Sequence, residues 1–175
     1  EYYCYMETIA GGNGARPTKD GPDGVQTNIQ NTENAPIEEV ELHYPIRVKR
    51  YELITDSCGP GRYRGGMAIR RDFEFPYAEC SWTVLSDGRK FAPWGLMGGF
   101  EGSCAKFIFD PEGEHRDLPS KCTIEVPKGG CVRVETAGAG GFGEPKNRDK
   151  DAVLQDLRDE KISDDVANHV YGLNS

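Results

Sequence analysis

The chain has 175 residues and a formal net charge of −8, with 37% hydrophobic and 29% charged residues. This length suits one domain, because a domain of about 150 residues removes roughly 70% of its extended-chain surface from water. An acidic chain lacks the basic footprint that nucleic-acid binding requires, so we exclude nucleic acid as a partner. The chain has no apolar run near the roughly 20 residues that cross a bilayer and no signal-peptide pattern, so we expect a cytoplasmic protein without a membrane partner.

Strand patterns dominate most of the chain. Short runs of β-favouring residues alternate with turns rich in Gly, Pro and Asp. We expect strands over residues 2–9, 24–30, 44–55, 67–75, 81–85, 105–109, 122–126 and 131–135. Residues 121–136 predict a β-hairpin, with two alternating strands joined by a Pro-Lys-Gly-Gly turn. Many short strands predict a mainly β, sandwich-like fold with glycine-rich loops.

The end of the chain changes its hydrophobic period. Residues 149–160 place three apolar side chains on one helical face, with charges elsewhere. A second short helix begins after Ser163, whose hydroxyl can accept from free backbone N–H groups. We therefore predict a β-rich domain at residues 1–146 and a tail of two short α-helices at residues 147–175, docked on the sheet or on a partner.

Two glycine-rich blocks stand in the first half, at residues 11–24 and 56–66. Glycine permits positive φ and lets another backbone or a ligand approach closely. Because both blocks also carry Arg and Asp, we expect them to build a polar site or a subunit contact. Neither the first block nor the run Gly138–Gly143 has the Gly-Lys-Ser/Thr ending of a phosphate loop. Tight turns or interface contacts are therefore favoured over a direct ATP site.

Arginines in these blocks are candidates for binding an anionic intermediate. Arg16 and Arg64 each offer a planar guanidinium that can grip a carboxylate or phosphate with two hydrogen bonds. In the alternative interpretation, the same arginines tie their loops to Asp20, Asp23 or Asp56.

Carboxylates supply the other candidates, Asp20, Glu38 and Asp56, because a carboxylate can act as a general base for water. Glu38 and Glu41 are expected at the entry from a loop into a strand, although their spacing suits a helical face better. The alternative is that these carboxylates only fix the glycine-rich loops through hydrogen bonds.

Six cysteines contain no C-x-x-C pair, so neither a zinc site nor a redox dithiol is indicated. Reduced structural thiols are the favoured interpretation for a cytosolic protein. Cys58 is the expected exception, because it lies in a polar loop beside Arg62 and Arg64, whose charges can lower a thiol pKa. The three histidines are scattered, and no metal site is predicted in this chain.

The motifs, taken in order, resemble the C-terminal part of hydantoinase B subunits. Each motif is weak alone, but their shared order covers nearly the whole chain. They are residues 7–16, 20–21, 34–38, 41, 44–48, 51–53, 56–57, 61–66, 93–96, 118–121, 135–143 and 171–173. The chain departs from the family pattern at Cys58, Gly130, Ala137 and Ala139.

The resemblance implies a part of an ATP-dependent, multi-subunit enzyme that hydrolyses cyclic amides such as hydantoin or 5-oxoproline. The implied partners are a hydantoinase A-like subunit and the N-terminal part of the hydantoinase B chain. ATP and Mg would bind largely to the partner subunit, and any further divalent metal would lie outside this chain. Two alternatives stay open: a subunit of an ATP-dependent acetone or acetophenone carboxylase, and a non-catalytic assembly module. Because full hydantoinase B chains are several times longer, we expect a fragment, a processed product or half of a split subunit.

Overall fold

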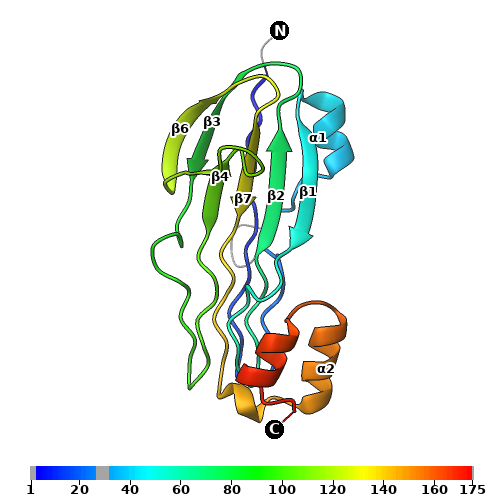
Figure 1. Ribbon diagram of the computed structural model, residues 1–175, viewed down its shortest axis with the longest axis vertical. Coiled ribbons are helices and arrows are strands. Elements are labelled where there is room, and N and C mark those ends of the chain that lie inside the picture. The colour runs from blue at the N-terminus through cyan, green and yellow to red at the C-terminus, as the bar shows by residue number, and fades with distance from the viewer. Residues whose placement is uncertain (1–2, 27–31, 175) are drawn as a thin grey trace.

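Two antiparallel sheets form the upper half of the protein in a computed structural model that describes residues 3–26 and 32–174 (Figure 1). The larger sheet has the strand order β1-β2-β7-β4-β5. Its strands are Arg47–Leu53 (β1), Ile69–Glu74 (β2), Lys106–Phe109 (β4), Arg116–Asp117 (β5) and Cys131–Glu135 (β7). The smaller sheet pairs Cys80–Leu85 (β3) with Lys121–Val126 (β6). The mainly β, sandwich-like prediction is confirmed.

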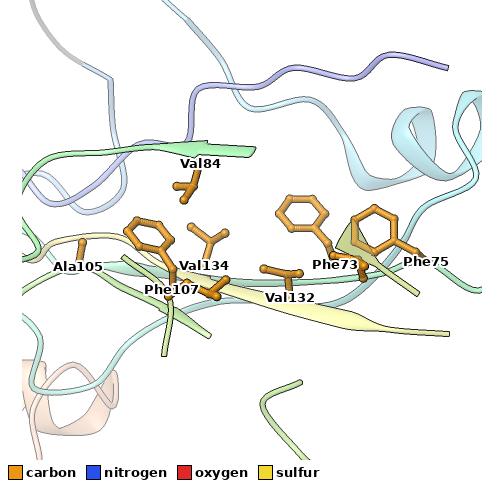
Figure 2. Close-up of a cluster of buried hydrophobic side chains, with 9 residues drawn as sticks. Phe73, Phe75, Val84, Ala105, Phe107, Val132 and Val134 are labelled. Carbon is orange, nitrogen blue, oxygen red and sulfur yellow. The ribbon is translucent and has the colours of Figure 1, made fainter. Parts of the chain in front are cut away.

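An apolar core joins the two sheets. Figure 2 shows Val84 of β3 pointing towards Phe107 and Val134 of the larger sheet. Val132 and Val134 alternate along β7, so both side chains face the same side. The burial of these side chains fixes the smaller sheet against the larger one.

The predicted hairpin at residues 121–136 is wrong. The expected turn is present, with the Gly130 N–H donating to the Pro127 carbonyl at 2.8 Å. However, β6 pairs with β3, whereas β7 pairs with β2 and β4. Phe75 exchanges backbone hydrogen bonds with Gly129 and Gly130, so the turn itself is attached to the end of β2. Alternation predicts strands, but it does not select their partners.

Extended segments without regular ladders run side by side below the sheets (Figure 1). We call four of them the glycine stack: residues 10–22, 57–67, 93–103 and 137–143. Backbone hydrogen bonds of 2.7–3.0 Å join the segments, from Gly12 to Ala137, from Gly66 to Asn13, from Gly59 to Ala139 and from Leu96 to Gly141. A Cβ on Gly65 would overlap the Ala139 carbonyl oxygen, so only glycine permits this approach.

Two of the expected strands are not strands. Residues 3–9 lie in neither helix nor strand, and residue 2 lies outside the described residues. Glu7 instead accepts from Arg71 Nη1 at 2.7 Å, so a side chain holds this segment. Residues 24–26 are also not in a strand, and residues 27–30 lie outside the described range. The other six predicted strands correspond to β1, β2, β3, β4, β6 and β7.

Helix α1, Ile37–His43, replaces the expected loop-to-strand entry. The three-residue spacing of Glu38 and Glu41 was the sign of this helix. Val40 is its buried anchor, and Glu41 accepts from the Val48 N–H at 2.9 Å where β1 begins.

The tail docks on the glycine stack. Helix α2, Lys150–Arg158, begins after Asp149, whose carboxylate accepts from two free N–H groups of the first turn. A π-helical turn, Val166–Val170, follows, and Ser163 Oγ accepts from the Val166 N–H at 3.3 Å as predicted. A second apolar core unites the tail with Cys58 and Met67 of the stack. None of the helices in the described part of the chain is long and apolar enough to span a bilayer.

Candidate functional site

Five charged side chains from distant parts of the sequence meet between the glycine stack and the tail. We call them the ion cluster: Asp20, Asp23, Arg64, Arg148 and Asp156. Both arginines and Asp156 are buried. The glycine-rich segments supply the first three members, and the tail supplies the other two.

Short charge-assisted hydrogen bonds connect the cluster. Arg64 donates to both carboxylate oxygens of Asp23, at 2.7 and 3.0 Å, and through Nε to Asp156 at 3.2 Å. Arg148 donates to both oxygens of Asp20, at 2.7 and 2.8 Å, and to Asp156 at 2.7 Å. Two-point arginine–carboxylate pairs are among the strong hydrogen bonds of proteins, so the cluster links three separate segments firmly.

Charges within the cluster nearly cancel. Three carboxylates face two guanidinium groups, and Lys161 Nζ lies 3.7 Å from Asp23. Burial opposes ionisation of Asp20, but the hydrogen bond and charge of Arg148 outweigh it and hold the pKa of Asp20 below its usual range. Arg64 and the Met67 N–H likewise outweigh burial at Asp23 and lower the pKa of that carboxyl. Both carboxyls are therefore ionised at neutral pH.

The cluster acts chemically as a cross-link. Because its carboxylates are already paired with arginines, the arrangement holds the loops in place. Arg64 thus makes the contacts expected in the alternative interpretation, in which an arginine ties its loop to an aspartate.

The structure brings Asp20 and Arg64 together and places the other predicted site residues elsewhere. Asp56 has a positive φ of 60° and accepts from the Ser163 N–H at 2.8 Å, so it anchors the tail. Arg16 is exposed and exchanges backbone hydrogen bonds with Lys19. Glu38 is exposed in the first turn of α1.

Sequence reasoning missed Arg148 and Asp156 as members of this cluster. Asp156 is three residues after Val153, so it falls on the apolar face of α2. A charged residue at such a position was the available signal, because a buried carboxylate requires a cation. No comparable pattern marks Arg148, which precedes the helix cap.

The lowered thiol pKa that the neighbouring arginines suggested for Cys58 is contradicted. Its side chain is buried in the second core beside Met67 and Val153 rather than exposed in a polar loop. Burial raises the pKa of this thiol to about 11, despite the nearby charge of Arg64. All six cysteines are free thiols.

No metal site is evident in the part of the chain that the structure describes. Within residues 3–26 and 32–174, no group of three or more His, Cys, Asp or Glu side chains could hold a metal ion.

Comparison with known proteins identifies the class of protein to which this fold and these loops belong. Residues 1–145 match the sequence model of a family described as hydantoinase B/oxoprolinase. The chain belongs to this family.

Three relatives illustrate the relationship. The candidate B chain of a D-/L-hydantoinase from Pseudomonas sp. (strain NS671) is 39% identical over 175 residues, covering 98% of this chain and 29% of that protein. The ATP-dependent caprolactamase of Pseudomonas jessenii is similar in structure, with a TM-score of 0.79 and 26% identity over 94% of this chain and 29% of that one. A nucleotide-free acetone carboxylase shares the fold, with a TM-score of 0.70 and 22% identity over 93% of this chain and 26% of that one. The chain thus spans less than a third of the length of these relatives.

Proposed function

We propose that this chain is the C-terminal part of a hydantoinase B-like subunit of an ATP-dependent enzyme that hydrolyses cyclic amides. The observation that carries the proposal is the similarity to a hydantoinase B chain along 98% of this chain. ATP and Mg bind largely to a hydantoinase A-like partner subunit in this proposal. The ATP-dependent caprolactamase, which acts on a cyclic amide by its name, supports the use of ATP.

The proposed reaction activates the amide before water attacks it. ATP transfers a phosphoryl group to the amide oxygen, and water adds to the same carbon. The ring C–N bond then breaks, with the nitrogen leaving as the amine, and the resulting acyl phosphate is hydrolysed by a second water to the carboxylate and phosphate. We propose that this region shapes the subunit interface and the path of the substrate. The glycine stack suits that role, because its backbone is held by hydrogen bonds between segments rather than by side chains alone.

The five site candidates separate into two groups by exposure and contacts. Arg16 and Glu38 are exposed, so we propose that they contact substrate or a partner. Asp20, Asp56 and Arg64 are held in internal contacts, so we propose that they position the loops. Replacement of an exposed candidate lowers turnover without changing the melting temperature, whereas replacement of an internal one lowers both.

A non-catalytic assembly module is the second candidate function. The ion cluster favours it, because Arg64 is already paired with Asp23 and Asp20 is already paired with Arg148. Such a module would hold the partner subunits together without touching the substrate.

Co-purification and an ATPase assay test both candidates. The chain is co-expressed with the A-type subunit and the rest of the hydantoinase B chain, and the complex is assayed with hydantoin, 5-oxoproline, acetone and acetophenone, with and without bicarbonate. Stimulation by a cyclic amide alone supports the hydrolase. Stimulation by a ketone only with bicarbonate replaces it with a ketone carboxylase. A complex that forms but that no substrate stimulates supports the assembly module. So does a substrate-stimulated activity that survives changes in both glycine-rich blocks.

A further inference from the structure

An apolar stretch lies within the connection from β3 to β4. Residues 91–100 contain no charged side chain and no hydroxyl, amide or carboxyl group, in a chain of which 29% is charged. Their large side chains are nonetheless exposed. We call residues 91–100 the apolar loop, whose large exposed side chains are Phe91, Trp94, Leu96, Met97 and Phe100. Trp94 is 77% exposed and Met97 is 76% exposed.

Single exposed apolar residues are ordinary, but a concentration of them marks an interaction site. Figure 1 shows this connection along one edge of the glycine stack, on the side away from α2. Within the described part of the chain, these side chains belong to neither apolar core. The loop therefore presents its apolar groups to the outside of the described chain.

The backbone of the apolar loop is held in one conformation. Leu96 donates to the Gly141 carbonyl at 2.9 Å, and Phe100 donates to the Pro60 carbonyl at 2.7 Å. Gly102 closes the loop by donating to the Pro93 carbonyl at 2.9 Å. A surface that is already ordered loses less conformational entropy when a partner binds.

A strained turn forms the tip of the loop. Met97 and Gly98 both have positive φ, at 52° and 91°, and the Gly99 N–H donates to the Leu96 carbonyl at 3.0 Å. Asn or Gly usually occupies the first of these positions, because other side chains are strained there. Met97 keeps this conformation with its side chain exposed, so its apolar group lies at the tip of the loop.

We propose that the apolar loop is the surface on which the rest of the B-type subunit packs. This inference rests on the proposed function, since it assumes that a B-type subunit surrounds this region. The hydantoinase B relative continues well beyond the match, because this chain covers only 29% of its length. In that relative the additional residues belong to the same polypeptide, so their effective concentration near this surface is high.

Charge and composition favour this occupant over the alternatives. An apolar, aromatic and Met-containing surface suits the apolar face of another folded segment, since such residues form the centres of protein interfaces. The chain as a whole carries a net charge of −8, which opposes both an anionic lipid surface and a second copy of itself. A polar or anionic small molecule would find only the indole N–H of Trp94 as a side-chain hydrogen-bonding group among residues 91–100.

Co-purification of the chain with the missing part of a hydantoinase B chain tests this proposal. The tagged 175-residue chain is co-expressed with the part of the Pseudomonas sp. relative that lies outside the match, as a separate polypeptide. The double variant Trp94→Ser/Met97→Ser should weaken association by about tenfold or more, because buried interface aromatics carry much of the binding energy. Both side chains are exposed in the isolated chain, so its melting temperature should not change.

The matched control is Tyr77→Ser, which removes an aromatic side chain that is 66% exposed in the connection between β2 and β3. It should retain wild-type association. Equal association of the double variant and the wild type would overturn the proposal. So would failure of the wild type to bind while the relative's own matched region does bind. Loop-dependent self-association, or loop-dependent binding of the A-type subunit alone, would assign the surface to a different occupant.

The substrate-stimulated ATPase assay separates this proposal from the proposed function. Loop-dependent association without any stimulation by a cyclic amide would remove the hydrolase and leave the docking surface standing. Stimulation by a cyclic amide, in a complex that the double variant forms as well as the wild type, would support the hydrolase and remove the docking surface.

Discussion

Arg148 and Asp20, which are 128 positions apart in the sequence, form a two-point ion pair with N–O distances of 2.7 and 2.8 Å. The pair joins the residue before the cap of α2 to the first glycine-rich segment. Arg148 also donates to Asp156 inside α2, so one side chain locks the tail to the glycine stack. The stability of the glycine stack and the position of the tail are therefore coupled.

Loss of Arg148 should destabilise the protein strongly. Arg148→Met removes the cation between Asp20 and Asp156, and breaking one partner of a buried ion pair costs about 3–5 kcal/mol. Urea denaturation measures this loss. Arg89→Met is the control, because Arg89 is exposed, and it should change the free energy of unfolding by less than about 0.5 kcal/mol. Similar values for both variants would show that the cluster contributes little.

Acid should weaken the fold through the aspartates of the cluster. Because the pKa values of Asp20 and Asp23 are lowered in the folded state, the unfolded chain takes up protons first as the pH falls. Their contribution is complete above the ordinary aspartate pKa of 3.8 and is lost as the pH falls below it. Urea midpoints measured between neutral pH and about pH 3 should therefore drop at the acid end.

The variant Asp20→Asn should show a smaller acid loss than the wild type, starting from a lower stability at neutral pH. Asp87→Asn serves as the comparison, because the Asp87 side chain is fully exposed at the protein surface. It should keep the wild-type pH dependence. An Asp20→Asn curve parallel to the wild type would mean that Asp20 is not the titrating group.

Glycine at position 65 should be indispensable. Gly65→Ala places a Cβ against the Ala139 carbonyl oxygen, and a backbone atom cannot move aside as a flexible side chain can. We expect a loss of about 3 kcal/mol or more in urea denaturation, at the upper end of the usual cost of overpacking. Gly14→Ala is the matched control in the same stack, because its Cβ would meet no atom within 4 Å. Equal losses would contradict the close-packed backbone.

Thiol labelling should separate Cys58 from Cys4. At pH 8 a thiol with a pKa of about 11 is ionised in roughly a thousandth of molecules, and Cys58 is also buried. Mass spectrometry after brief alkylation should find Cys4, which is exposed, modified and Cys58 unmodified. In urea both should react. Rapid labelling of native Cys58 would contradict both its burial and its raised pKa.

Much of the fold could be predicted from the sequence because its signals are local. Alternating side chains located β1 and β7, and the helical period located α2. The expected capping role of Ser163 was also found, ahead of the π-helical turn that follows α2. Short-range order and composition do not depend on how the rest of the chain folds, so neighbouring residues are enough to reveal them. The glycine motifs were also sufficient for the family, because their order along the chain carries the information.

Only the tertiary structure decided which strands pair and which charges meet. The alternation of residues 121–126 and 131–135 was equally compatible with a hairpin, but packing against β3 and β2 separated them. Arg64 and Asp156 are 92 positions apart, and the residues around each of them do not predict their contact. The burial of Cys58 likewise follows from the docking of the tail. Long-range contacts of this kind depend on where the whole chain folds back, so single positions in the sequence do not encode them.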